Sequence, residues 1–364
     1  MVRPIQQETL IPLWELKKIK GIDNLVTDDL RVPPGFVRAA DNLDIDSEDM
    51  GHRRKGILEE IFNGFWHSLW SDEGDLCFGV RNGDLVRLNK DWTLNILLSG
   101  VGYSKMNFVK VVDRVFFSNR EESGYILISD GLAHGFPEPP RDLRQRMVGG
   151  EIIEYFNGRL YAIQDQTYFH SIAYSPMEMN LKHNFQFMGG PVTMFHAVED
   201  GIYASAAEKT FFMGYEGETD LDQPKFKYKP LLDVPTLKGS PCLIERLDLG
   251  KEISTSHTSH RGLVGKAIIF STGIGIFIGL KGGYVVDCTS DHYAVLDVEE
   301  GCSLVKWQNG YRQYIFLGQA PAQIGGGSFK IRLPMLTGLF SGTVTTPYGI
   351  SGRLPLLRGR FVGH

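Results

Sequence analysis

A short hairpin pattern recurs along this chain and limits what it can fold into. An apolar stretch runs into a tight turn of glycine or charged residues, and a second apolar stretch follows at once. The six copies read LCFGVRNGDLVRL, VVDRVFF, YFNGRLYAI, AVEDGIYAS, IFIGLKGGYVVDC and KWQNGYRQYIF. Asn-Gly, Asp-Gly and Gly-Gly supply the residues with positive φ that two-residue β-hairpin turns require. The pattern therefore predicts short antiparallel strands over most of the chain.

The spacing of the hairpins indicates a repeat. With Asp113, Gly158, Gly201 and Gly283 as markers, the steps are 45, 43 and 82 residues, and 82 is twice 41. A repeat of about 40–45 residues made only of strands is typical of β-propeller blades. We therefore predict an all-β, β-propeller-like fold of about five to seven small antiparallel sheets with extended N- and C-terminal arms. The copy expected near residue 242 falls among three prolines, so we expect that blade to be irregular.

Three segments of the chain differ in pattern. Residues 1–56 do not resemble a blade, although 43–55 reads as a hairpin with an acidic strand and a basic return strand. Residues 57–320 hold the hairpin repeats, and residues 321–364 lack the hydrophobic density for a core of their own. We predict an N-terminal arm with a hairpin at 1–56, a β-propeller-like body at 57–320 and a basic C-terminal arm at 321–364.

Charge is unevenly distributed along the chain. The net charge is −5, yet no Asp or Glu follows Glu300, and the last 64 residues carry seven Lys or Arg. Residues 1–300 therefore carry −12. This asymmetry favours a basic segment that contacts phosphate or an acidic protein surface, with a solvated basic tail as the alternative. The candidate interface residues are Arg332, Arg353, Arg358, Arg360, Arg53 and Arg54.

No motif in the sequence predicts catalysis or a cofactor. The four cysteines form no Cys-x-x-Cys pair, and Gly273–Gly279 has the spacing GxGxxxG, one residue longer than a dinucleotide fingerprint. The stretch LDIDSEDMG lacks the Gly and the closing Glu of a calcium loop. His257 and His260 read as part of a polar loop, with a metal site as the alternative. We therefore predict a protein that is not an enzyme, with no catalytic residue, no metal and no cofactor. The chain shows neither a signal peptide nor an apolar run long enough to span a membrane, so we expect it to be made in a cytoplasm.

The N-terminal stretch carries a resemblance. GIDN followed by VPPGFVRAADNLDIDSEDMGHRRKG resembles the N-terminal phrase of a group of tailed-bacteriophage virion proteins, in which it introduces a β-propeller-like body. The later phrases HSLWSDEGDLCFGVRNGDLVRL, EYFNGRLYAIQDQTYFHSIAYSP and GIFIGLKGGYVVDCTSDHY are similar too, so the resemblance spans about residues 20–318. The matching positions of the N-terminal phrase are Asn42, Asp44, Asp46, Gly51, Arg54 and Gly56.

The resemblance implies a structural role in a phage tail. Proteins of this group form a ring, often a hexamer, in the nozzle or hub around the DNA channel, and such rings also anchor tail fibres. The implied partners are further copies of the chain, adjacent tail or head–tail proteins, possible fibres, and viral DNA that passes without sequence-specific binding. The implied location is the virion tail. This chain is much shorter than the well-known nozzle proteins, and Lys55-Gly56 replaces the usual Arg-Pro-Gly return.

Two other functions stay open at this stage. A propeller binding module could recognise a carbohydrate or receptor on a host surface, with Trp66 and Trp70 stacking on sugars. A propeller hydrolase or lyase would need clusters of inward-facing histidines or carboxylates at equivalent blade positions, and the sequence shows none.

Overall fold

The structure is a computed structural model of the 364-residue chain. It describes residues 21–25, 31–37, 43–45, 51–53, 62–72, 76–139, 144–180, 182–219, 223–245, 265–289, 298–308, 311–319, 342–345 and 351–354.

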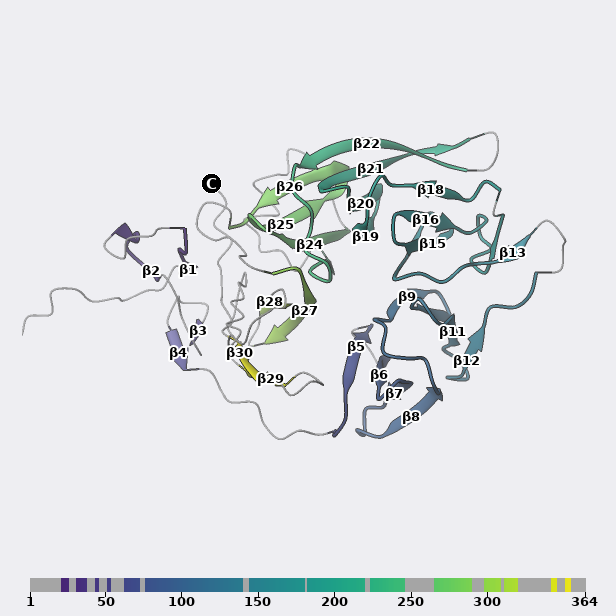
Figure 1. Ribbon diagram of the computed structural model, residues 1–364, viewed down its shortest axis with the longest axis horizontal. Coiled ribbons are helices and arrows are strands. Elements are labelled where there is room, and N and C mark those ends of the chain that lie inside the picture. The colour runs from purple at the N-terminus through teal and green to yellow at the C-terminus, as the bar shows by residue number, and fades with distance from the viewer. Residues whose placement is uncertain are drawn as a thin grey trace, which may run out of the picture.

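Six antiparallel sheets in this part of the chain follow one another around a common centre, and we call them blades 1 to 6 (Figure 1). Blade 1 comprises β5 (Trp66–Ser71), β6 (Cys77–Arg81), β7 (Asp84–Leu88) and β8 (Leu94–Leu98). Blade 2 comprises β9 (Asn107–Val111), β10 (Arg114–Ser118), β11 (Ser123–Leu127) and β12 (Ala133–Gly135). Blade 3 comprises β14 (Ile152–Phe156), β15 (Arg159–Gln164), β16 (Thr167–His170) and β18 (Phe185–Phe187).

The remaining blades continue the circle. Blade 4 comprises β19 (Val192–Val198), β20 (Gly201–Ala206), β21 (Lys209–Glu218) and β22 (Pro224–Leu232). Blade 5 comprises β23 (Cys242–Glu245), β24 (Lys266–Thr272), β25 (Gly275–Leu280) and β26 (Tyr284–Asp287). Blade 6 is described as two strands, β27 (Glu300–Gln308) and β28 (Tyr311–Gln319). The fold is therefore all-β and β-propeller-like, as the sequence predicted.

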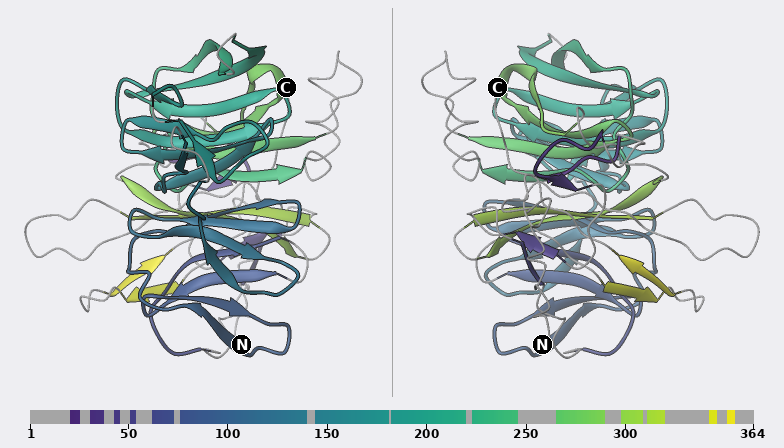
Figure 2. Two further views of the ribbon diagram at one scale, coloured as in Figure 1. Left: turned by 90° about the vertical axis from the view of Figure 1, so that its right-hand side faces the viewer. Right: turned by 90° about the vertical axis from the view of Figure 1, so that its left-hand side faces the viewer.

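Strands within each blade run up and down in chain order. The first strand of a blade lies nearest the centre, because β14 packs against both β9 and β19, the first strands of its two neighbours. Figure 2 turns the molecule by 90° and shows the strands lying along the viewing direction of Figure 1. In blades 1 to 5, the start of the blade and the turn between its second and third strands consequently lie at the same end of the ring.

Hairpin turns form where the sequence predicted them. Asn82-Gly83 and Asn157-Gly158 both have positive φ, at 52° and 84° and at 45° and 78°, as the favoured two-residue turns require. At Val112, with φ of 53°, the chain makes the β9–β10 turn with a β-branched residue instead.

Two details of the predicted repeat are wrong. Gly158 lies in the turn between the first and second strands of its blade, but Gly283 lies in the 3-10 turn η3 (Lys281–Gly283), between the third and fourth. The step of 82 residues therefore does not measure two repeats. Near residue 242 the described strands are regular, because Cys242 begins β23, which pairs with β24 without a register shift, and Pro230 belongs to β22 of the preceding blade; residues 246–264 lie outside the described residues.

The core lies between blades. Four apolar clusters of the described residues each join two successive blades, from blades 1 and 2 through to blades 4 and 5. Between blades 3 and 4, the rings of Tyr161 and Tyr168 lie 5.6 Å and 5.5 Å from that of Phe195, and all three side chains are buried. Each buried aromatic removes on the order of 150–250 Å² from water, so these contacts fix the neighbouring blades against each other.

Short strand pairs lie outside the six blades. β1 (Gly21–Ile22) pairs with β2 (Phe36–Val37), and β13 (Gln145–Arg146) pairs with β17 (Glu178–Met179). The predicted N-terminal hairpin is confirmed as β3 (Leu43–Ile45) and β4 (Gly51–Arg53), and β29 (Gly342–Thr345) pairs with β30 (Ser351–Leu354). The predicted division at residues 56 and 320 stays a prediction. No helix among the described residues is long and apolar enough to span a membrane.

Candidate functional site

One end of the ring gathers the charged groups of several blades. We call it the connector face, because it holds the segments that lead into the blades and the turns between second and third strands. Glu151 leads into blade 3 and Lys238 leads into blade 5, while Arg120 and Asp165 lie in the second turns of blades 2 and 3. The fold thus places side chains on one face that are up to 118 residues apart in sequence.

Glu151 is the centre of an ion-pair network on this face. Arg120 Nε donates to Glu151 Oε1 at 2.6 Å, Lys238 Nζ lies 2.9 Å from Oε2, and Arg120 also pairs with Asp165. Burial opposes ionisation of Glu151, but the hydrogen bonds and charges of Lys238 and Arg120 outweigh it and hold the pKa of this carboxyl below its usual value. The network therefore links blades 2, 3 and 5 through one ionised carboxylate.

A second group of polar residues lies beside Lys238. Part of the Lys105 residue is exposed, but protein atoms around its ammonium group desolvate it and lower its pKa. The charge of Lys238 lowers this pKa further, while Cys302 and Glu300 raise it. Desolvation raises the pKa of the exposed Cys302 thiol, and Lys105 opposes that shift. These residues come from the entries to blades 2, 5 and 6, so the connector face also brings together polar groups of blades that are not successive along the chain.

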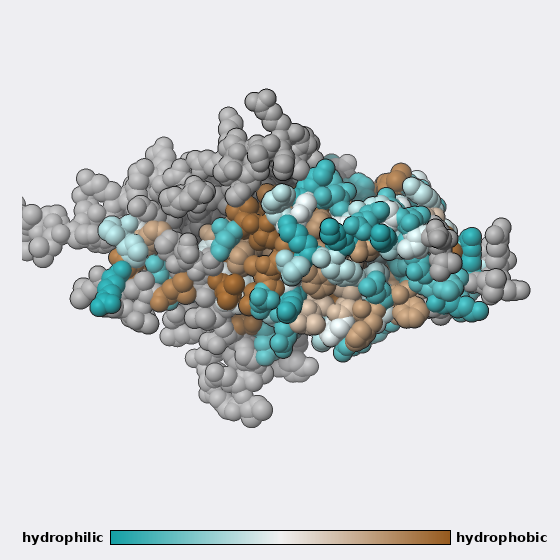
Figure 3. Space-filling model, turned by 90° about the horizontal axis from the view of Figure 1, so that it is seen from above, coloured by the Kyte–Doolittle hydropathy of each residue, from teal (hydrophilic) through white to brown (hydrophobic). Residues whose placement is uncertain are grey.

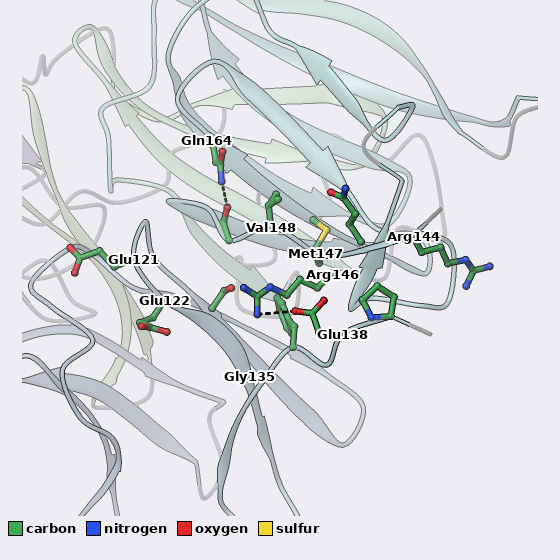
Figure 4. Close-up of a pocket in the computed structure, with 14 residues that line it drawn as sticks. Glu121, Glu122, Gly135, Glu138, Arg144, Arg146, Met147, Val148 and Gln164 are labelled. Atoms are coloured by element: carbon green, nitrogen blue, oxygen red, sulfur yellow. Dashed lines mark hydrogen bonds and ion pairs between the residues drawn. The ribbon is translucent and has the colours of Figure 1, made fainter. Parts of the chain in front are cut away.

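A pocket of about 910 Å³ opens between blades 2 and 3 (Figure 4). Its lining combines carboxylates, guanidinium groups and amides with an apolar part made by Phe136, Met147 and Val148. The polar side chains that line it are Glu121, Glu122, Ser123, Glu138, Arg144, Gln145, Arg146 and Gln164. The volume is in the range of sites that hold a small molecule or part of a peptide.

The charges in the pocket are only partly compensated. Arg146 lies 3.7 Å from Glu138, and Arg144 is drawn outward to Glu178 at 2.6 Å. Glu121 accepts a hydrogen bond from the Ser104 hydroxyl at 2.8 Å. Neither Glu121 nor its neighbour Glu122 forms an ion pair with a described residue, and both are exposed. This side of the pocket therefore presents acceptors to a cationic group.

Aromatic side chains stand exposed beside the pocket, on blade 1. The rings of Phe65 and Tyr103 lie 5.9 Å apart, with 39% and 66% of each residue exposed. Tyr103 precedes Ser104, whose hydroxyl donates to Glu121, although neither Tyr103 nor Phe65 lines the pocket itself. Trp92 is also exposed, at 58%, and its ring is 6.4 Å from that of Phe62.

The two tryptophans proposed for sugar stacking differ in their surroundings. Trp70 stacks on Phe78 with ring centroids 5.9 Å apart and packs against the core between blades 1 and 2. Trp66 is half-buried, and the Arg81 guanidinium lies 5.9 Å from its ring. Both side chains are partly buried, and only Trp70 packs against an apolar core cluster.

The charged interface candidates from the sequence are mostly outside the described residues. Arg53 ends β4 opposite Leu43, and Arg353 lies in β30 opposite Thr343. The others outside the described part of the chain are Arg54, Arg332, Arg358 and Arg360. No group of three or more His, Cys, Asp or Glu in the described part could hold a metal ion.

Sequence reasoning missed both the ion-pair network and the pocket. A visible signal existed only for the pocket, because Glu121 and Glu122 are adjacent carboxylates in the sequence. Nothing in the sequence indicated that Lys238 would meet Glu151.

Comparisons with known proteins give structural similarities only. No known family and no curated protein matches the chain. Among solved structures, a streptogramin B lyase is similar with a TM-score of 0.41 and 10% identity, covering 82% of this chain and 84% of its own. An auxiliary nutrient binding protein from Bacteroides thetaiotaomicron has a TM-score of 0.40 and 9% identity, covering 70% and 67%. The N-terminal domain of Nup159 has a TM-score of 0.38 and 10% identity, covering 67% and 71%.

Proposed function

We propose that the chain is a structural subunit of a bacteriophage tail, in a nozzle or hub ring around the DNA channel. Its partners in this role are further copies of itself and adjacent tail proteins, with viral DNA passing through the assembled ring. The carrying observation is the order of elements along the chain. The β3–β4 hairpin at Leu43–Arg53 precedes a ring of small sheets that begins at Trp66, which is the order that the phage resemblance implies.

Exposed apolar side chains on the outer strands support a role in assembly. Phe185 and Phe187 of β18 are 50% and 62% exposed, Ile96 of β8 is 63% exposed and Tyr284 of β26 is 51% exposed. Figure 3 shows apolar side chains gathered near the middle of one face of the molecule, between polar ones. Exposed outer strands with large apolar side chains are suited to contacts with other subunits.

Location and assembly state test the proposal directly. Gold-labelled antibodies against the chain should mark one end of the tail of phage particles from the producing strain, and mass spectrometry of purified virions should detect it. Negative-stain images of the purified chain, or of the chain mixed with tail proteins, should show rings. Particles that lack the chain would overturn the proposal.

A binding module for host-surface carbohydrate is the second candidate. The observation that favours it is the exposed aromatic pair at blade 1, where the rings of Phe65 and Tyr103 are open to solvent and the Phe65 amide bonds to the Asn82 side chain, next to Arg81. Aromatic faces beside amide and guanidinium donors are suited to sugar rings. Binding of the purified chain to a glycan array, abolished by Tyr103→Ala but kept in Tyr284→Ala, would favour this function over the structural one.

A further inference from the structure

We propose that the pocket between blades 2 and 3 receives the basic C-terminal segment of a second copy of this chain. The inference rests on the proposed assembly function and names the contact that would join neighbouring subunits. The occupant is the segment SGRLPLLRGRFVGH, residues 351–364, of the adjacent copy.

The pocket offers three kinds of group that match such a segment. Glu121 and Glu122 provide exposed carboxylates without an ion pair in the described structure, and Arg144 is already held outside by Glu178. Phe136 and Met147 line the cavity from the core, while the half-buried Val148 provides its accessible apolar side chain. Tyr103 and Phe65 lie outside the pocket as exposed aromatic rings, and Tyr103 adjoins Ser104, which bonds to Glu121. Such rings attract cations over their faces.

The segment has the complementary chemistry in its sequence. It carries Arg353, Arg358 and Arg360 and no carboxylate side chain, and its other positions are rich in leucine, with one phenylalanine. Guanidinium groups pair with carboxylates through directed hydrogen bonds, while leucine and phenylalanine side chains bury against an apolar surface. The charge difference between residues 1–300 at −12 and residues 301–364 at +7, three of these charges in the segment itself, also favours encounter of the two.

A complementation experiment with full-length chains separates contact between copies from contact within one copy. The pocket variant is Glu121→Gln with Glu122→Gln, and the tail variant is Arg353→Gln with Arg358→Gln and Arg360→Gln. Each variant alone should associate about tenfold more weakly than the unchanged chain, as measured by light scattering over a concentration series. An equal mixture should recover association, because the intact pocket of the tail variant can accept the intact tail of the pocket variant.

Two controls show that the effect belongs to this contact. Glu208→Gln removes an exposed carboxylate from the equivalent second turn of blade 4, outside the pocket, and should leave association unchanged. Raising the salt concentration should weaken association of the unchanged chain more than that of either variant, since the contact is between exposed charges. Circular dichroism of each variant should match the unchanged chain, which excludes loss of fold as the cause.

The outcomes are distinct. If the unchanged chain associates and the pocket variant does so equally well, the pocket assignment is overturned while the tail-subunit function stands. If both variants are weakened and the mixture recovers nothing, the segment acts within its own copy and the proposal is overturned. If the unchanged chain stays monomeric at every concentration, contact between copies is overturned, and antibody labelling of virions decides the tail function independently.

Discussion

Lys238 Nζ lies 2.9 Å from Glu151 Oε2, although 87 residues separate the two in sequence. The contact joins the segment that enters blade 5 to the segment that enters blade 3, with blade 4 between them along the chain. Since Arg120 of blade 2 binds the same carboxylate, a single side chain connects three parts of the ring.

Replacing Glu151 should loosen the ring without unfolding it. The side chain of Glu151 is 20% exposed and that of Lys238 is 42% exposed, so solvent screens part of the attraction. We expect Glu151→Gln to lower the free energy of unfolding by about 1–2 kcal/mol, measured by urea denaturation at pH 7. Glu138→Gln is the control, because Glu138 is 81% exposed and its pair with Arg146 is long, at 3.7 Å. Equal losses of unfolding free energy for the two substitutions would show that the ion pairs of Glu151 stabilise the fold no more than an exposed ion pair does.

The same carboxylate predicts a dependence on pH. The pKa of Glu151 in the folded chain is held below its ordinary value of 4.5, so ionised Glu151 stabilises the fold above the unfolded-state pKa. This contribution is lost as the pH falls through the lower folded-state pKa. We expect the stability difference between the unchanged chain and Glu151→Gln to shrink between pH 6 and pH 3, as followed by denaturation midpoints. A difference that stays constant over this range would assign the effect to packing.

Tyr203 should stabilise the contact between blades 4 and 5 through its hydroxyl. The side chain is buried, and the hydroxyl donates to the carbonyl oxygen of Leu280, while the carbonyl oxygen of Tyr284 lies at 2.9 Å. Tyr203→Phe leaves the buried carbonyl oxygen of Leu280 without this partner, which should cost about 1–2 kcal/mol in thermal or urea unfolding. Tyr103→Phe removes a hydroxyl from a residue that is 66% exposed and should change stability by less than about 0.5 kcal/mol.

Gly158 and Gly273 should respond differently to alanine. Gly158 has φ of 78°, and a Cβ there would lie 3.0 Å from the Tyr174 ring, whereas a Cβ on Gly273 meets nothing within 4 Å. We expect Gly158→Ala to destabilise the chain by about 1 kcal/mol or more. Gly273→Ala, also in a hairpin turn, should be neutral within about 0.5 kcal/mol. Melting temperatures of the two variants, compared at the same pH, test this contrast.

Val112 offers the opposite change, a gain in stability. It is 88% exposed and has φ of 53°, a conformation that a β-branched side chain rarely adopts. Val112→Asn removes the branching from the β9–β10 turn and suits the left-handed conformation. An increase of about 0.5–1 kcal/mol in the free energy of unfolding is expected. A decrease would show that the Val112 side chain contributes a contact that outweighs its backbone strain.

Local features of the fold could be predicted from the sequence because they depend on adjacent residues. Asn82-Gly83 and Asn157-Gly158 specify their hairpins by backbone geometry alone, and strand pairs follow from them. The repeat was harder to place, because a glycine turn occurs between different pairs of strands in different blades. Gly283 resembles Gly158 in sequence context but joins the third strand to the fourth.

The candidate site could not be predicted in the same way. The pocket draws Glu121, Glu138, Arg146 and Gln164 from two blades and the segment between them. Their proximity depends on the rotation of one blade against the next, which the cores between blades determine. Trp70 illustrates the same limit, since the sequence suggested a sugar platform and packing turned the ring toward Phe78.

The up-and-down order of strands has a consequence for how such a molecule can change over time. Second turns and entry segments share one rim, while the side chains that hold neighbouring sheets together lie along the strands between the two rims. Substitutions at positions such as Glu121, Glu122 or Asp165 can therefore alter what docks on that rim and leave the buried aromatic contacts intact. A lineage of these chains can acquire new binding partners by exchanging a few turn residues, with no need to rebuild its interior.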